Sequence, residues 1–223
     1  MRHSRRTHKK RKLRIKRVLL LIVFFFAIYY AIYGLTFIKV NNVIIKGNKI
    51  LSDQEIIEIA KIKHKPSFLL TSNLILERRL LKNNYIGKAD VKKGLLSINI
   101  KITERRVLFI YNDEKITLDN IIKDKKNIYA PRLINNVPEK KYNRFIKAMN
   151  TINDDTLLKI SEIYYDPNNV DDDRFLLYVN DGNKVYLTIE KFSKINNYNE
   201  IIKTIGSKNG TLYLDYGNYF ESN

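Results

Sequence analysis

An uncharged, strongly apolar run of 21 residues, from Val18 to Ile38, constrains this chain more than any other feature. An α-helix of that length rises about 31 Å, which matches the thickness of the hydrocarbon core of a bilayer. The run is longer than the roughly 7 to 15 apolar residues of a signal peptide, and it lacks a small-residue cleavage site. We therefore expect residues 18–38 to form an uncleaved transmembrane helix.

The net charge of +18 is concentrated in front of this run, because residues 1–17 contain ten Lys and Arg side chains and no acid. Basic flanks are retained on the cytoplasmic side of a membrane. The sequence therefore predicts a cytoplasmic tail over residues 1–17, with everything after the span outside the cytoplasm. The same tail would be attracted to anionic lipid. The basic residues nearest the span supply the topology signal: Arg11, Lys12, Arg14, Lys16 and Arg17.

Composition excludes several classes of enzyme. The chain has no cysteine, which rules out a disulfide framework, a thiolate zinc site and a cysteine nucleophile. Two of its three histidines lie in the basic tail, so a Ser-His-Asp triad outside the membrane could use only His64. His64 lies between two lysines, and we interpret it as a solvated loop residue. Neither a phosphate-binding loop nor a dinucleotide fingerprint is present, and no cofactor or metal is expected.

Residues 39–106 predict a small domain with the order strand, helix, helix, strand, strand. The first strand, over residues 40–46, ends at a Gly-Asn turn. Ser52 and Glu55 have the spacing of a capping box that starts a helix over residues 53–61.

The rest of this small domain follows from side-chain periodicity. Leu74, Leu80 and Leu81 are expected on the apolar face of a second helix. Two strands are then expected, over residues 88–93 and 97–103. In the second strand, Ile98, Ile100 and Ile102 alternate with polar residues and should face the core.

Residues 107–217 predict a second α+β domain dominated by sheet, followed by a short C-terminal tail over residues 218–223. Apolar residues with helical spacing indicate two helices, one from Tyr142 to Met149 and one from Ile195 to Ile205. Runs rich in β-branched and aromatic residues indicate strands over residues 107–111, 115–118, 160–165, 175–179, 184–189 and 211–216.

Two groups of charged residues are candidates for chemistry. Asp166 and the run Asp171-Asp172-Asp173 lack the glycine and distal glutamate of a calcium loop, so we interpret them as a polar loop. A pair of glycosidase carboxylates remains an alternative. Glu104 and Arg105, at a predicted strand end, are interpreted as a surface or interdomain ion pair.

Five short segments follow the apolar run in a characteristic order: Val43–Asn48, Tyr85–Val91, Thr103–Arg105, Gly182–Val185 and Leu212–Asp215. In this order relative to the span, the sequence resembles the bacterial FtsQ/DivIB family of division proteins. That family has a basic cytoplasmic tail, one span, a POTRA domain of the order predicted for residues 39–106, and a β-rich second domain.

The resemblance implies a non-enzymatic scaffold in the cell membrane at the division septum. Its implied partners are FtsL-like and DivIC/FtsB-like single-span proteins, through which it would help to control septal peptidoglycan synthesis. Membrane lipid would be contacted through the span and the basic tail, and neither nucleic acid nor a small-molecule substrate is expected. A membrane-anchored cell-wall hydrolase or transferase is the main alternative, and a membrane-anchored DNA-binding protein is a third hypothesis.

The predicted terminal strand, Thr211-Leu212-Tyr213-Leu214-Asp215-Tyr216, is the expected partner-binding segment. No later strand is predicted, so one edge should be open to strand addition by a partner. Leu212, Leu214 and Tyr216 are expected to face the core, and Thr211, Tyr213 and Asp215 the other side. Tyrosine is common among interface hot spots, which makes Tyr213 the preferred exposed anchor. The resemblance supports this location, since FtsQ-like proteins bind partners near the end of the β domain.

Overall fold

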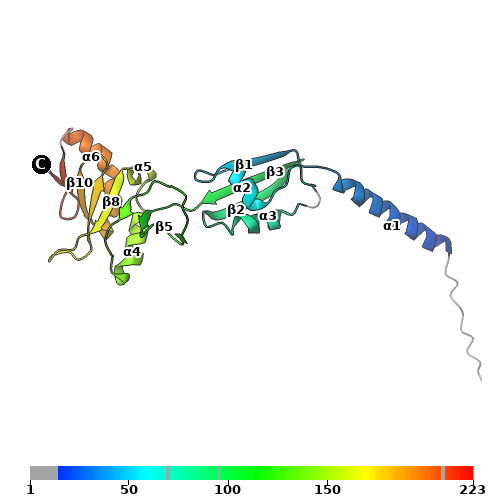
Figure 1. Ribbon diagram of the computed structural model, residues 1–223, viewed down its shortest axis with the longest axis horizontal. Coiled ribbons are helices and arrows are strands. Elements are labelled where there is room, and N and C mark those ends of the chain that lie inside the picture. Colours follow the sequence, from blue (N-terminus) through cyan, green and yellow to red (C-terminus); the bar gives the residue numbers. More distant parts are fainter. Residues whose placement is uncertain (1–14, 69–70, 95, 207–208, 223) are drawn as a thin grey trace, which may run out of the picture.

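The computed structural model describes residues 15–68, 71–94, 96–206 and 209–222. A long N-terminal helix is followed by a small α+β domain and then by a larger, sheet-rich domain (Figure 1). Three residues of the predicted topology signal, Arg11, Lys12 and Arg14, lie outside the described residues, whereas Lys16 and Arg17 lie in the first turn of the helix. The mixed α+β fold class expected from the sequence is confirmed.

Helix α1 spans Ile15–Thr36 and buries none of its residues against the rest of the protein. Its mean hydropathy reaches 2.5, and within the described part of the chain it is the one helix long and apolar enough to cross a membrane. Apolar side chains exposed all around a helix need an apolar solvent. The predicted helix is therefore present and available as a membrane anchor.

The small domain has the predicted β-α-α-β-β order. Strand β1 pairs in parallel with β3, which pairs antiparallel with β2 to give the sheet order β1-β3-β2. The two helices contribute to the same hydrophobic core as the sheet. The elements are β1 (Asn42–Lys46), α2 (Asp53–Ala60), α3 (Asn73–Leu80), β2 (Ile86–Gly94) and β3 (Ser97–Glu104).

Local sequence signals account for two of these elements. The Ser52 hydroxyl accepts a hydrogen bond from the Glu55 N–H, and the Glu55 carboxylate accepts one from the Ser52 N–H at 2.8 Å. This confirms the capping box, which satisfies amides left free at the start of α2. The isoleucines of β3, residues 98, 100 and 102, are all buried, as their alternation predicts.

The predicted apolar face of the second helix was partly wrong. Leu80 is fully buried, but Leu74 is 65% exposed and Leu81 is 46% exposed. Leu76 takes the core position instead, one turn before Leu80. Helical spacing offered more than one apolar stripe, and docking against the sheet selected one of them.

The second domain is built on a nine-stranded sheet with the order β12-β11-β10-β9-β8-β7-β4-β5-β6. Its helices are α4 (Glu139–Met149), α5 (Asp154–Leu157), the 3₁₀ segment η1 (Ile189–Asn197) and α6 (Tyr198–Ile205). Its strands are β4 (Phe109–Tyr111), β5 (Glu114–Ile116), β6 (Ile121–Ile122), β7 (Arg132–Leu133), β8 (Ile160–Tyr165), β9 (Arg174–Val179), β10 (Lys184–Thr188), β11 (Gly210–Tyr213) and β12 (Tyr219–Ser222).

The core of this domain lies between one face of the sheet and the helices α4, η1 and α6. Phe145 of α4 stacks on Phe175 of β9, with ring centroids 4.7 Å apart, and Phe192 of η1 meets both rings edge-on. Alternate residues of strands β9 to β11, such as Leu177 and Leu212, are buried in the same cluster. Within the described residues, the helices of this domain pack on that one face, and no helix is found against the other face of these strands.

Two elements at the end of the chain differ from the sequence-based expectation. Residues 219–222, expected in a tail, form strand β12, which pairs antiparallel with β11. The strand predicted over residues 211–216 spans Gly210–Tyr213 and ends before Leu214. A short return turn after residue 213 was not recognised, because residues 214–218 combine apolar and turn-forming side chains.

Candidate partner-binding surface

The segment predicted to bind a partner, residues 211–216, is placed inside the sheet rather than at its edge. Strand β11 lies between β10, to which it is parallel, and β12, to which it is antiparallel. The expectation of an open edge along Thr211–Tyr216 was therefore wrong. At the other end of the sheet, β6 lies against the small domain, and its Ile122 is buried in that domain's core. The sheet end away from the small domain is formed by β12.

The two faces of the segment agree with the prediction at some positions and not at others. Leu212 and Leu214 are each 1% exposed in the core, as predicted. Tyr216, expected in the core, is 56% exposed because the strand has already ended. Asp215, expected to face outward, is buried. Tyr213 lies on the face opposite Leu212, half-buried among neighbouring aromatic rings.

Tyr213 is the middle ring of a three-strand tyrosine stack on the face without helices. Its ring lies 5.3 Å from that of Tyr186 on β10 and 4.5 Å from that of Tyr219 on β12, nearly parallel to both. These residues are direct neighbours in the strand register. The Tyr213 hydroxyl donates to Glu221 of β12 at 3.2 Å. Burial and this hydrogen bond raise the pKa of Tyr213 above its usual value.

A buried ion pair, formed by Arg174 and Asp215, lies against the Tyr186 end of the tyrosine stack. The Arg174 guanidinium lies 3.5 Å from the centre of the Tyr186 ring. Its Nε donates to the Asp215 carboxylate at 2.8 Å, and a terminal nitrogen donates to Asp166 at 3.0 Å. Burial alone lowers the pKa of Arg174, but the bond to Asp215 and the nearby carboxylates raise it above its usual value. The guanidinium therefore fixes both the Tyr186 ring and the chain that leaves β11.

A second pair of tyrosines extends the same face over β8 and β9. The rings of Tyr164 and Tyr178 meet edge-on at 5.4 Å, and the Lys184 ammonium lies 5.5 Å from the Tyr178 ring. The register of β8 through β12 places all these side chains on the face away from the helices. We call this surface the tyrosine face; its tyrosines are Tyr164, Tyr178, Tyr186, Tyr213 and Tyr219.

Four of these five tyrosines are not among the residues predicted from the sequence, although a signal for them was available. Tyr178 and Tyr186 alternate with core residues inside strands that were predicted correctly, so a period-two reading places them together on the outer face. Tyr219 could not be found this way, because strand β12 was not predicted. Large amphipathic rings that bind at low cost in side-chain entropy are enriched at protein interfaces.

The aspartate cluster forms ion pairs with helix α4. Lys141 contacts Asp172 at 2.6 Å and Asp173 at 3.0 Å, and Arg144 contacts Asp173 at 2.9 Å. In the described ranges, no group of three or more possible ligands could hold a metal ion. These carboxylates join a loop to a helix, which is consistent with the interpretation as a polar loop.

Glu104, Arg105 and Arg106 lie at the junction of the two domains. The Glu104 carboxylate accepts three backbone N–H bonds, from Lys49, Ile50 and Leu51, at 2.7–2.8 Å. Arg105 donates to the Ile86 carbonyl and forms an ion pair with Asp119 of the second domain. The interpretation of Arg105 as an interdomain ion pair is therefore correct, whereas Glu104 instead caps a backbone turn.

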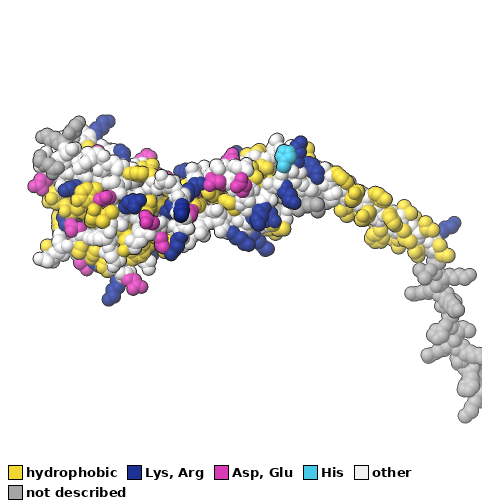
Figure 2. Space-filling view, viewed as in Figure 1, with side chains coloured by type: hydrophobic (Ala, Val, Ile, Leu, Met, Phe, Trp, Pro, Cys, Tyr) yellow, Lys and Arg dark blue, Asp and Glu magenta, His cyan; other side chains and the backbone are white. Residues whose placement is uncertain are grey.

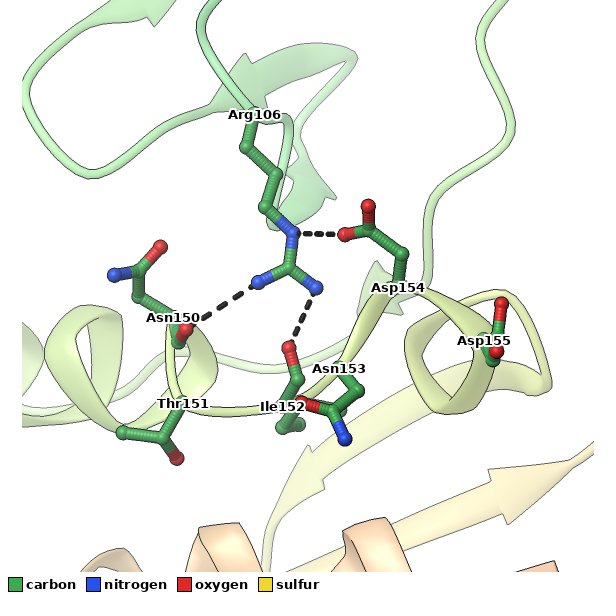
Figure 3. A pocket seen from close by; sticks show the side chains of 7 residues that line it. All are labelled: Arg106, Asn150, Thr151, Ile152, Asn153, Asp154 and Asp155. Carbon is green, nitrogen blue, oxygen red and sulfur yellow. Dashed lines mark hydrogen bonds and ion pairs between the residues drawn. The ribbon is translucent and has the colours of Figure 1, made fainter.

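Arg106 lines a polar pocket beside this junction, and its side chain extends toward the loop of residues 150–155 (Figure 3). Its guanidinium binds Asp154 at 2.7 Å and donates to the carbonyls of Asn150 and Ile152. The two terminal nitrogens thus bond to backbone carbonyls and the Nε forms an ion pair, so Arg106 ties the end of β3 to the loop after α4. His64 lies exposed in the loop after α2, far along the chain from these groups.

Comparison with known proteins gives consistent matches along the chain. Residues 38–105 match the POTRA domain, FtsQ-type, and residues 102–216 match the Cell division protein FtsQ/DivIB, C-terminal. The Cell division protein DivIB of Bacillus subtilis (strain 168) is 28% identical over 96% of this chain and 86% of its own length. That of Listeria monocytogenes is also 28% identical, over 96% of this chain and 85% of its own.

A solved structure of the major extracytoplasmic domain of DivIB from Geobacillus stearothermophilus is 22% identical, with a TM-score of 0.36. The matched region covers 43% of the present chain and 88% of the solved chain. The family assignment depends on the sequence matches. Since these run from residue 38 to residue 216, and the C-terminal match alone covers more than half of the chain, this chain belongs to the FtsQ/DivIB family of cell division proteins.

Proposed function

We propose that this chain is a non-enzymatic division scaffold that binds FtsL-like and DivIC-like single-span proteins at the septum. Through them it would help to control septal peptidoglycan synthesis. Family membership supports a role in cell division. A scaffold acts through surfaces, and the surface that best fits this role is the tyrosine face with the adjoining strand β12.

The observation that carries the proposal is an aromatic sheet face that ends at the last strand of the sheet order. Strand β12 follows β11 at this end, and Tyr219 on it is 52% exposed. A partner strand added beside β12 would extend the sheet by backbone hydrogen bonding. Side chains of that strand would then meet Tyr219, whose ring stacks on Tyr213. Tyr213 thus keeps a proposed role in binding, through the Tyr219 ring that it supports, with strand addition moved from β11 to β12.

The membrane arrangement is part of the same proposal: the N-terminus is cytoplasmic and both domains are extracytoplasmic. Basic residues gathered before α1 support this orientation. A reporter that is active only outside the cytoplasm should work when fused after Asn223 and fail when fused before Met1. The opposite pattern would contradict the orientation and the proposed partners together.

The direct test compares Tyr213→Ala with Tyr129→Ala, an exposed tyrosine outside the tyrosine face. We expect Tyr213→Ala to weaken binding of the DivIC-like extracytoplasmic domain by roughly 30-fold or more, the loss typical of an interface hot spot. Tyr129→Ala should bind like the unmodified chain. Affinity is measured by calorimetry, and circular dichroism establishes that both variants are folded. Unchanged affinity of folded Tyr213→Ala would place the interface elsewhere.

The alternative of a cell-wall hydrolase or transferase has its own test. The full chain in detergent is incubated with peptidoglycan, beside Asp172→Asn as the variant of the most prominent carboxylate cluster. We expect no release of fragments from either protein. Turnover by the unmodified chain that Asp172→Asn abolishes would defeat the scaffold proposal.

A further inference from the structure

The small domain, identified above as the POTRA domain, is tied closely to the end of α1. The Thr36 carbonyl, at the last residue of α1, accepts a bond from the Ser67 hydroxyl at 2.8 Å. The Phe68 N–H donates to the Ile38 carbonyl at 2.8 Å. Val40, only two residues after the apolar run, is 2% exposed in the core of the domain. Two residues span at most about 7 Å. A POTRA domain on so short a link stays at the surface of the membrane that holds α1.

Four lysines lie on the chain segments that these bonds hold beside the span. Lys39 belongs to the link itself, and Lys61, Lys63 and Lys65 belong to the loop that pairs with it. We call these four residues the lysine collar. All four side chains are exposed, none forms an ion pair with another described residue, and neither segment contains an acid. In Figure 2, basic side chains and a histidine gather at the end of the domain nearest the helix.

The net charge of the two domains differs, and the positive charge belongs to the POTRA domain. Residues 39–106 contain 15 basic and 6 acidic side chains, a net charge of +9. Residues 107–223 contain 16 basic and 17 acidic side chains, a net charge of −1. The excess positive charge that follows the predicted span therefore belongs to the domain beside the membrane. There it complements anionic headgroups, which attract nearby lysines.

Exposed apolar side chains accompany the collar. Leu96, in the β2–β3 hairpin, is 38% exposed, and its carbonyl accepts a bond from the N–H of Asn41 in the link at 2.9 Å. Leu74 is 65% exposed in the first turn of α3, just after Thr71, which bonds back to Ser67. Lysines around exposed leucines are typical of surfaces that lie in the interface of a membrane.

We infer that this end of the POTRA domain is a lipid-binding surface, on which the lysine collar binds anionic phospholipid headgroups while Leu74 and Leu96 enter the interface. The occupant is the leaflet that holds the outer end of α1. The surface would fix the tilt of the POTRA domain relative to the membrane. This inference rests on the membrane anchoring contained in the proposed function.

The test uses the absence of tryptophan from the chain, so that a single introduced tryptophan reports on one position. The full chain carrying Leu74→Trp is reconstituted into vesicles of brominated phosphatidylcholine with or without phosphatidylglycerol, and quenching of its fluorescence is measured. Phe25→Trp, in the middle of α1, reports on anchoring. Leu158→Trp, an exposed position in the second domain, serves as the distant control.

We expect Leu74→Trp to be quenched in vesicles with phosphatidylglycerol, and Leu158→Trp not to be. Adding Lys63→Glu and Lys65→Glu to Leu74→Trp should remove roughly half or more of its quenching, as should omission of the anionic lipid. The matched pair Lys82→Glu and Lys88→Glu, exposed in the same domain but outside the collar, should leave it unchanged. Circular dichroism establishes that the charge variants are folded.

Two outcomes would overturn the inference, and they differ in what else they overturn. Unquenched Leu74→Trp beside quenched Phe25→Trp would reject lipid binding by the POTRA domain and leave the scaffold proposal intact. If the quenching of Leu74→Trp changes neither with phosphatidylglycerol content nor with the collar substitutions, the lysines are rejected as headgroup ligands. Unquenched Phe25→Trp would instead reject the membrane anchoring on which both proposals depend.

Discussion

Replacing Arg174 by methionine tests how much the interactions of its guanidinium with Asp215, Asp166 and Tyr186 stabilise the second domain. The Arg174 side chain is 13% exposed, and the side chain of its partner Asp215 is 2% exposed. Methionine fills a similar volume without charge, so the change removes the bonds to Asp215 and Asp166 and the stacking on Tyr186. Asp215 would keep the N–H of Tyr216 as a donor to its carboxylate. A nearly dry carboxylate would then lack its counter-charge.

Breaking a buried pair in this way costs about 3–5 kcal/mol, which lowers the Tm of a domain of this size by roughly 10–20 °C. The assay is equilibrium unfolding in guanidinium chloride followed by circular dichroism. Arg144→Met is the matched control: its side chain is 50% exposed and pairs with Asp173, so we expect a loss of about 1 kcal/mol or less.

The double variant Arg174→Met with Asp215→Leu gives the decisive comparison, because it removes both charges together. Replacing a whole buried pair by apolar residues is often nearly neutral, so the double variant should be more stable than Arg174→Met alone. A loss below about 1 kcal/mol for Arg174→Met, or a double variant as unstable as the sum of the single ones, would refute this reasoning.

Three further predictions concern the POTRA domain and its junction. Ile100→Asp buries an unpaired carboxylate and should lower stability by several kcal/mol in thermal unfolding, whereas a change at Lys101, on the exposed face, should be within about 0.5 kcal/mol. Glu104→Ala removes the acceptor of three short N–H bonds and should cost about 2–3 kcal/mol in guanidinium unfolding; an unchanged midpoint would contradict its capping role. The Lys126 ammonium and the Ser52 amide lower the pKa of Glu55 from 4.5 to about 2, so the stability from this interdomain pair is present above pH 4.5 and is lost as the pH falls toward 2. Lys126→Ala should flatten that part of the stability-against-pH curve, and an identical curve would contradict the assignment.

Several features of this protein follow from neighbouring residues alone. The apolar run from Val18 to Ile38 defines a helix that can span a bilayer, whatever follows it. The Ser52–Glu55 spacing starts α2, because both capping bonds close within one turn. Alternation at Ile98, Ile100 and Ile102 assigned the buried face of β3, since the side-chain period of a strand is a local property.

The tertiary structure decided the features that depend on distant segments. Glu104 is 53 to 55 residues from the amides that it caps, so its identity as an acid at a strand end did not reveal its partners. Leu76 rather than Leu74 faces the core, because the sheet selected one of the stripes available on α3.

The partner-binding segment shows the same division most clearly. The alternation of side chains correctly placed Leu212 in the core and Tyr213 on the opposite face. The edge of the sheet, however, is formed by β12, and no local sequence pattern predicted that β12 pairs with β11. Stacking of Tyr186, Tyr213 and Tyr219 requires three strands brought into register, two of them parallel and joined through η1 and α6. A local pattern fixes which way a side chain points; only the packing of remote strands fixes what lies beside it, because that packing follows from the burial of the whole core.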